Sequence, residues 1–454
     1  MTAATDLTKG NIRAQFLALA FPLLAGNILQ QLYNTVDAVI VGKFVGDAAY
    51  AAVGVAGSVM NLFLFLISGA CSGVSVLLSQ FYGEGNRALF HREFFLSAIF
   101  GGVCTLLLTF LGLGVLSPLL KALHTPEDVL AYTHEYLQII LWGLLVSFAY
   151  HLCSSVLRAV GNTRAALLFL SVSMATNLLL DLLFVGYFRI GISGAAWATV
   201  TAQALSALLC VRYLIKHFPS LVFHREDMTY DGALLRRTAY FSFSFALQMC
   251  GLYIGKLFVQ GTVNSLGTDA ISAYTGATRI EGLANSFGDS GCAAMAVFIG
   301  QNTGAENDQR IRKGFFQGEC MLAGLGLAMS LGMLLSAPSL LPLVLPERNG
   351  ASLAPAVDYL KLLACFYLFN FLGSGLSGYY QGRGRVRLPV IGSTGHITLR
   401  ALLSWWLAPI LSLPAVAMAT GIGWIGVVIY WSAVMYRTER PIRKAPPHAH
   451  NGTN

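Results

Sequence analysis

Long apolar segments follow one another along almost the entire chain, and only short polar breaks separate them. About 20 apolar residues suffice to cross a bilayer, so each segment is long enough, and several must tilt or extend beyond the bilayer. Apolar residues are continuous rather than alternating, which favours helices over the strands of a membrane barrel. The pattern predicts an all-α membrane protein with twelve transmembrane helices, at residues 14–41, 50–80, 94–119, 131–157, 165–187, 194–215, 236–265, 270–300, 315–345, 355–380, 388–411 and 414–436.

The composition supports a membrane location. Hydrophobic residues make up 56% of the 454 residues and charged residues only 11%, whereas soluble domains carry about 25% charged residues. We assign the net charge of +8 to loops in the cytoplasm and not to nucleic-acid binding. We expect the protein to be embedded in the lipid bilayer and to bind no nucleic acid. All eight cysteines lie singly in apolar segments and are interpreted as buried, inert thiols.

Lysine and arginine residues concentrate at alternate helix ends. The opposite ends carry only Lys43, Lys121, Arg189, Arg348 and Lys361. Cytoplasmic loops are enriched in these two residue types. We therefore predict a multi-pass protein of the cell (inner) membrane with both termini in the cytoplasm. The basic ends include Arg13, Arg87, Arg92, Arg158, Arg164, Lys216, Arg237, Arg310, Arg312, Arg383, Arg387 and Arg437.

The second half of the chain repeats the first at an offset of about 221 residues. Gln80 in SQFYG aligns with Gln301 in GQNTG, and LRAVGNTR aligns with YQGRGRVR. Each copy holds six predicted helices, so both copies have the same orientation, and we expect two pseudo-symmetric six-helix bundles with a substrate cavity between them. The predicted organisation is an N-terminal lobe at 1–215, a cytoplasmic linker at 216–235, a C-terminal lobe at 236–436 and a disordered cytoplasmic tail at 437–454.

Two carboxylates and one amide lie inside predicted helices of the first half. Asp37 is in the first helix, and Asn177 and Asp181 share one face of the fifth. Ionisable side chains within a membrane are costly and mark functional sites. Two buried carboxylates repel each other, so this pair should hold a proton or share a cation, which is the chemistry of a cation-coupled antiporter. Pro22 removes a backbone hydrogen bond from the first helix and is the predicted bend.

The identity of the cation stays open at this point. Carboxylate and amide oxygens suit Na⁺, and the same carboxylate pair suits H⁺. Two structural alternatives also stay open: Asp37 as a carboxylate in the headgroup zone, and Asp181 as the acceptor of an interhelical hydrogen bond. The second half does not copy the acids, because Asp37 aligns there with Phe258. It has its own intramembrane charges, for which structural ion pairing and a transport role are equally open: Lys256, Arg279, Glu281, Asp289 and Arg400.

Several enzyme signatures are absent from the sequence. It contains neither a G-x-x-x-x-G-K-[ST] nor an H-E-x-x-H motif, which argues against ATP hydrolysis and against a zinc hydrolase. We expect no enzymatic activity, no metal beyond a possible Na⁺ at Asp37, Asn177 and Asp181, and no cofactor beyond the coupling ion, H⁺ or Na⁺.

From about residue 11 to residue 436 the chain resembles the multidrug and toxic compound extrusion (MATE) family. The resemblance implies efflux of small, amphipathic, mostly cationic organic compounds, coupled to a cation gradient at a site in the N-terminal lobe. Asp37, Asn177 and Asp181 match that site, and Thr199 matches its threonine on the sixth helix. Some members use carboxylates on helices seven and ten instead, which fall here on Leu252 and Asn370. The motifs that carry the resemblance are NTVDAVIVG, SQFYGEGN, LRAVGNTR, NLLLDLLF, GAAWATVTAQ, ATRIE and FIGQNTGAENDQRIRKG.

One alternative function belongs to the same superfamily. A flippase for lipid-linked oligosaccharides or lipids would need cationic side chains for phosphates, and Lys256, Arg279 and Arg400 would supply them. For either function we expect alternating access by a monomer.

Overall fold

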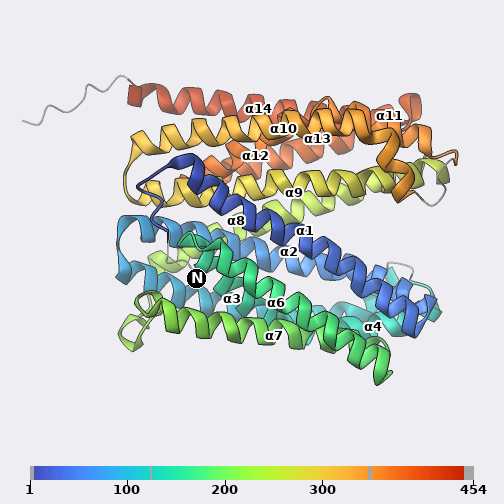
Figure 1. The fold of residues 1–454 in the computed structure, drawn as a ribbon, viewed down its shortest axis with the longest axis horizontal. Helices are drawn as coiled ribbons and strands as arrows, with labels where there is room; N and C mark the ends of the chain where they lie inside the picture. The colour runs from blue at the N-terminus through green and yellow to red at the C-terminus, as the bar shows by residue number, and fades with distance from the viewer. Residues whose placement is uncertain (1–4, 123–124, 346–349, 444–454) are drawn as a thin grey trace, which may run out of the picture.

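The computed structural model describes residues 5–122, 125–345 and 350–443, and within these ranges all regular structure is helical. The chain forms two lobes that lie side by side (Figure 1). The N-terminal lobe contains α1 (Ile12–Val45), α2 (Asp47–Glu84), α3 (Arg87–Ala122), α4 (Glu127–Trp142), α5 (Leu144–Ala159), α6 (Thr163–Asp181), the π-helical turn η1 (Leu182–Tyr187) and α7 (Ile192–His217). The C-terminal lobe contains α8 (Gly232–Asn264), α9 (Thr268–Gly304), α10 (Asp308–Val344), α11 (Leu353–Ala364), α12 (Tyr367–Gly382), α13 (Arg387–Leu411) and α14 (Leu413–Arg443).

Each lobe contains six membrane-length rods. Among the described residues, eight helices are long and apolar enough to cross a bilayer alone, and two bent pairs each form one further candidate span. The bends are 49° between α4 and α5 and 50° between α11 and α12, so the spans predicted at 131–157 and 355–380 are broken rather than straight. The long helices α9 and α13 bring the number of membrane-length rods in the C-terminal lobe to six. The prediction of an all-α membrane protein with two six-helix halves is confirmed.

Backbone turns repeat between the lobes as the sequence does. Residues with positive φ recur at matching places, with Gly46 (φ 119°) and Gly267 (φ 96°) between the first two helices of each lobe. Gly161 (φ 76°) and Gly384 (φ 75°) follow the bent pair in each lobe. Glycine adopts this left-handed region without the steric cost that a Cβ imposes. The two halves therefore share turn geometry as well as helix order.

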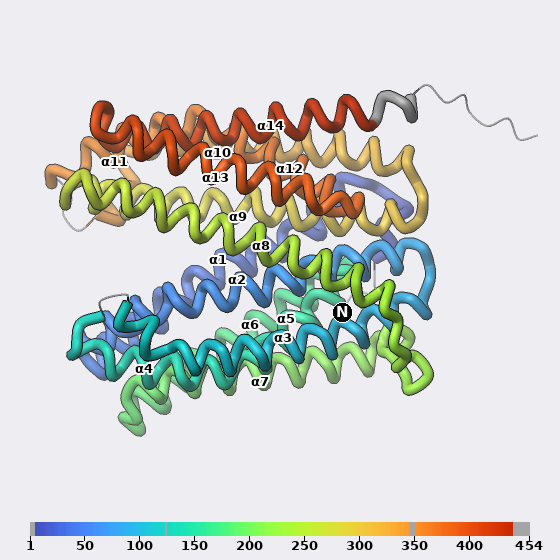
Figure 2. Tube along the Cα trace, turned by 180° about the vertical axis from the view of Figure 1, so that it is seen from behind, coloured from blue at the N-terminus to red at the C-terminus, as the bar shows by residue number. Residues whose placement is uncertain are grey.

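The lobes meet through α1 and α2 on one side and α8 and α9 on the other. Gly73 allows the closest approach of α2 to α8, because a Cβ there would lie 2.7 Å from the carbonyl oxygen of Phe241. Small residues allow such contact between membrane helices. We call the end that holds the α2–α3 turn the linker end. The lobes are close together there and diverge toward the opposite, far end (Figures 1 and 2).

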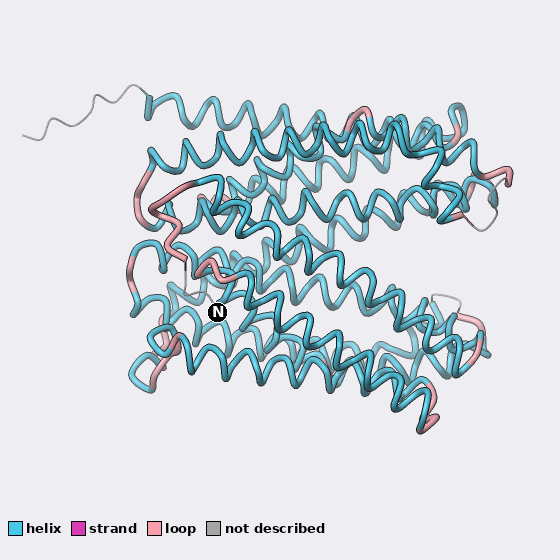
Figure 3. Tube along the Cα trace, viewed as in Figure 1, coloured by secondary structure: helices cyan, strands magenta, loops and turns pink. Residues whose placement is uncertain are grey.

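Irregular chain gathers at the two ends of the molecule (Figure 3). The connection between the lobes lies at the linker end and contains two short 3₁₀ turns, Pro219–Leu221 and Arg225–Asp227. The segment predicted as a disordered tail, 437–454, is helical as far as Arg443, where α14 ends. Its remainder, 444–454, lies outside the described residues.

Candidate cation site in the N-terminal lobe

The four residues that we assigned to cation coupling converge inside the N-terminal lobe. Asp37 comes from the C-terminal third of α1, Asn177 and Asp181 from the end of α6, and Thr199 from α7. All four are buried, and their exposed fractions are 6% for Asp37, 2% for Asn177, 0% for Asp181 and 8% for Thr199. The Asp37 and Asp181 carboxyl groups are direct neighbours, within reach of one shared proton. Three helices therefore bring two carboxylates, an amide and a hydroxyl together away from solvent.

Thr199 connects the polar groups of this site. Its Oγ1 accepts a hydrogen bond from Nδ2 of Asn177 at 3.1 Å and lies 3.2 Å from the Tyr33 hydroxyl. Because the Asn177 amide nitrogen points to Thr199, its Oδ1 is left on the other side of the amide. Tyr33 was not predicted as a site residue. It lies one helical turn before Asp37 in LYNTVD, so an i, i+4 search around the acid could have found it.

Several oxygens of the site receive no hydrogen bond from the described residues. These are Oδ1 of Asp37, both carboxylate oxygens of Asp181, and Oδ1 of Asn177. Neither carboxylate forms an ion pair within the described part of the chain. Buried oxygens without donors are costly, and two adjacent carboxylates add repulsion. A proton or a hard cation held among them would remove both costs.

A cavity of about 290 Å³ opens beside the two acids, between α1 and α6. Apart from the acids, Asn177, Tyr33 and Ser171, its walls are aliphatic. The apolar lining residues are Leu29, Leu32, Val36, Met174, Ala175 and Leu178. An apolar wall with a few polar groups at one end is typical of sites for small amphipathic molecules.

The helix that carries Asp181 changes geometry at that residue. The α-helical part of α6 ends at Asp181, and the π turn η1 follows directly. Single π turns are rare and occur often at functional sites. Its sequence, LLFVGY, is simply apolar, so nothing in it predicted this turn. α1, by contrast, is continuous from Ile12 to Val45 with Pro22 inside it.

The charges of the C-terminal lobe do not form one site. Glu281 and Arg400 are buried, whereas Lys256, Arg279 and Asp289 are exposed. Arg400 donates a hydrogen bond from Nη2 to the Tyr274 hydroxyl at 3.3 Å, and Oε1 of Glu281 accepts one from Asn285 at 3.4 Å. No ion pair joins any of the five within the described ranges.

Helix α1 links the N-terminal site to the C-terminal lobe. Nε2 of Gln31 donates to the Ser286 hydroxyl of α9 at 2.8 Å, and Nδ2 of Asn27 donates to the Ser290 hydroxyl at 3.1 Å. Gln31 lies six residues before Asp37 on the same helix. A movement of α1 at the acid site would therefore change contacts between the lobes.

Two related six-helix lobes with a pair of buried acids on facing helices define a polytopic membrane transporter. The MatE family model matches residues 22–183 and again residues 245–406, once in each lobe. The chain belongs to this family of multidrug efflux transporters.

Individual relatives agree with this placement. The chain is 27% identical over 417 residues to the probable multidrug resistance protein YpnP of Bacillus subtilis, covering 89% of this chain and 91% of that protein. Its fold is similar to an outward-facing multidrug resistance MATE family transporter, with a TM-score of 0.91, 19% identity and coverage of 98% and 100%. A MOP superfamily transporter from Pyrococcus furiosus gives a TM-score of 0.89 at 20% identity, with the same coverage.

Proposed function

We propose that the protein is an antiporter that exports small amphipathic organic compounds in exchange for H⁺ or Na⁺ through alternating access. One observation carries the proposal: Asp37 and Asp181 are buried neighbours, and neither has a cationic side chain as a partner within the described structure. Such a pair changes its energy strongly when a cation arrives or leaves. That property is needed to couple an ion gradient to a conformational change.

The same residues fit a bare cation. The two carboxylates, Oδ1 of Asn177 and Oγ1 of Thr199 are all oxygen ligands, which Na⁺ prefers. The hydrogen bond from Asn177 to Thr199 holds the amide oxygen available to the ion. With H⁺ as the coupling ion, the two acids share a single proton and Thr199 serves only to orient Asn177. The steps of the transport cycle are the same for both ions.

Ion binding acts on the transport cycle through α1. A bound cation lowers the charge of the acid pair and relieves its repulsion, which lets α1 and α6 approach each other. The helices bend at Pro22 and at the π turn after Asp181. This narrows the cavity beside the acids and expels the substrate toward the far end, which we assign to the outside of the cell. The α1 contacts of Gln31 and Asn27 with α9 then transmit the shift to the other lobe.

Transport by purified protein in vesicles tests the proposal. A fluorescent organic cation is loaded, and Na⁺ and pH gradients are imposed separately. D37N and D181N remove a charge but little volume, so both should fold and both should lose gradient-driven export. D47N is the matched control, because Asp47 is exposed in the first turn of α2. Export at the wild-type rate by both site variants would place the coupling site elsewhere.

The orientation and assembly are part of the same proposal. We place the linker end and both termini in the cytoplasm of a monomer in the cell membrane, as the Lys/Arg distribution indicates. A protease site added after Asn454 should be protected from external protease in sealed right-side-out vesicles. It should be cleaved after the vesicles have been permeabilised. Cleavage in sealed vesicles would reverse the orientation.

The flippase alternative has less support. Of the three cations that would hold phosphates, Arg400 is buried against Tyr274, and the exposed Lys256 and Arg279 share their lobe with the exposed Asp289. Transfer of a labelled polyprenyl phosphate in the same vesicles, without export of the organic cation, would favour it.

A further inference from the structure

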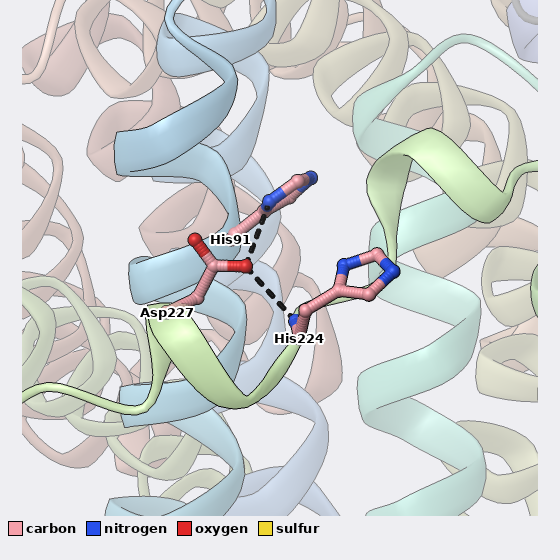
Figure 4. A group of neighbouring side chains, drawn as sticks. All are labelled: His91, His224 and Asp227. Carbon is pink, nitrogen blue, oxygen red and sulfur yellow. Dashed lines mark hydrogen bonds and ion pairs between the residues drawn. The ribbon is translucent and has the colours of Figure 1, made fainter.

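Three potential metal ligands meet where the connection between the lobes crosses the start of α3 (Figure 4). His91 lies on the second turn of α3, His224 directly precedes the 3₁₀ turn Arg225–Asp227, and Asp227 is the last residue of that turn. One ligand atom from each lies within 4.8 Å of the other two. The cluster is at the linker end and is separate from the proposed coupling site.

The segment that carries His224 is anchored independently of the cluster. The Phe223 ring packs edge-on against Phe94 at 5.1 Å and Phe95 at 5.5 Å between ring centroids. Arg87 donates from Nη1 to the carbonyl and hydroxyl oxygens of Ser220 at 3.2 Å and 2.9 Å. The cluster is thus held on a segment already packed against α3, which reduces the entropy cost of ordering its ligands.

The hydrogen bonds of His91 leave one ring nitrogen directed at Asp227. Nε2 lies 2.8 Å from the carbonyl oxygen of Ser220, which can only accept, so Nε2 carries a proton. In the neutral ring Nδ1 is then a bare acceptor, yet it lies 3.1 Å from Oδ2 of Asp227, a second acceptor. A second proton on the ring, which makes the contact an ion pair, or a metal cation held by the two atoms would satisfy both.

This arrangement matches the surroundings of metal-bound histidine. A ligating imidazole usually donates its other N–H to a backbone carbonyl or a carboxylate, which fixes its tautomer. Here the Ser220 carbonyl has that role. Oδ2 of Asp227 is oriented in turn by the backbone N–H of His224 at 2.9 Å. Ligands of tetrahedral zinc, bound at about 2.0–2.1 Å, lie about 3.3 Å apart, close to the observed separation of Nδ1 and Oδ2.

We propose that His91, His224 and Asp227 bind a divalent transition-metal ion of the zinc class. Two imidazoles and one carboxylate are borderline ligands that prefer such ions over Mg²⁺ or Ca²⁺. The exposed ring of His224 completes the set by rotating about its side-chain bonds. The Arg87 guanidinium beside Ser220 opposes a doubly charged ion, which makes the binding readily reversible.

Binding would have a mechanical consequence. The metal would add to the contacts that already attach the connection between α7 and α8 to α3 of the N-terminal lobe. That connection must follow both lobes as they move, so an occupied site slows any step that shifts it relative to α3. Metal binding at this site depends neither on the transported substrate nor on the coupling ion.

Direct metal binding tests the proposal. Full-length protein in detergent is stripped with a chelator and titrated with Zn²⁺ against a chromophoric competitor, and Co²⁺ serves as a spectroscopic probe. We expect one ion per chain, with affinity at least about tenfold lower in H91Q and in H224Q. H224Q removes only the ring and keeps the backbone hydrogen bond to Asp227.

Two controls separate this site from other histidines. H217Q changes a histidine at the end of α7 outside the cluster, and H448Q/H450Q changes the two histidines near the C-terminus. Both controls should bind Zn²⁺ with wild-type affinity. Absence of binding, binding that survives H91Q and H224Q, or binding lost in H448Q/H450Q would each overturn the proposal. Unaltered transport by D37N would argue against the proposed coupling site and would not argue against metal binding at His91, His224 and Asp227.

Discussion

Gln80 of α2 and Gln301 of α9 make the same hydrogen bond in opposite directions across the boundary between the lobes. Nε2 of Gln80 donates to the carbonyl oxygen of Gly382 at 2.9 Å, and Nε2 of Gln301 donates to that of Ala159 at 2.7 Å. Gly382 ends α12 and Ala159 ends α5, which are equivalent helices in the two halves. The sequence repeat therefore becomes a pseudo-symmetric contact that holds the linker end closed.

Loss of either glutamine should loosen the linker end. Q80A or Q301A leaves a buried carbonyl without its donor, which costs about 1–3 kcal/mol. We expect faster hydrogen–deuterium exchange in residues 75–84 and 296–304 for both variants. Q260A is the matched control, since Gln260 is on α8 and its side chain, among the described residues, bonds only to Asn264, four residues along the same helix. Unchanged exchange in both site variants would show that the two glutamines do not hold the linker end closed.

Two glycines should be required for the same closure. A Cβ at Gly83 would overlap the Gln301 carbonyl oxygen, and a Cβ at Gly304 would overlap that of Gln80. G83A and G304A should therefore keep the lobes apart at this end, at a cost of about 1–3 kcal/mol, and lower export. Alanine at Gly102 or Gly324 meets open space and should leave export unchanged. Vesicle assays with the four variants compare these rates directly, and wild-type export by G83A would contradict the prediction.

Much of the fold could be predicted because its causes are local. Two six-helix halves could be predicted from the twelve apolar segments, from the motifs around Gln80 and Gln301, and from the offset between these motifs. The bends at Gly143 and near Cys365 could not be predicted, because they depend on packing. A Cβ at Gly143, for example, would overlap the Val200 side chain on α7. No proline lies within 131–157 or 356–380 to mark a break in the sequence.

The charged residues of the candidate site could be predicted from the sequence, but the uncharged residues that contact them could be predicted only in part. Asp37 and Asp181 were conspicuous because carboxylates are costly in a membrane. Tyr33 was missed, because a tyrosine in an apolar helix carries no comparable signal until α7 brings Thr199 within 3.2 Å of it. Likewise, nothing in the sequence showed that Arg400 would bond to Tyr274 rather than to Glu281.

The hydroxyl of Thr199 should set the affinity for the coupling ion. T199V removes the acceptor of the Asn177 hydrogen bond and leaves the amide free to turn its oxygen away from the acids. We expect the ion concentration for half-maximal export to rise roughly tenfold, which corresponds to about 1.4 kcal/mol. T199S keeps the hydroxyl and should behave as wild type. The two variants are compared by export rate across a series of Na⁺ concentrations and pH values, and equal curves for both would argue against this role.

Glu281 should matter less for coupling than Asp37, although both are buried. Asn285 of the same lobe donates to Oε1 of Glu281 at 3.4 Å, whereas Oε2 has no donor among the described residues. The repeat also places no carboxylate at the position equivalent to Asp37, which aligns with Phe258. E281Q can still accept hydrogen bonds through its amide oxygen, so we expect it to retain most gradient-driven export, whereas D37N loses it. The measurement is uphill export of the fluorescent cation under identical imposed gradients, normalised to the amount of protein in the vesicles. An equal or greater loss in E281Q would move the coupling site to α9.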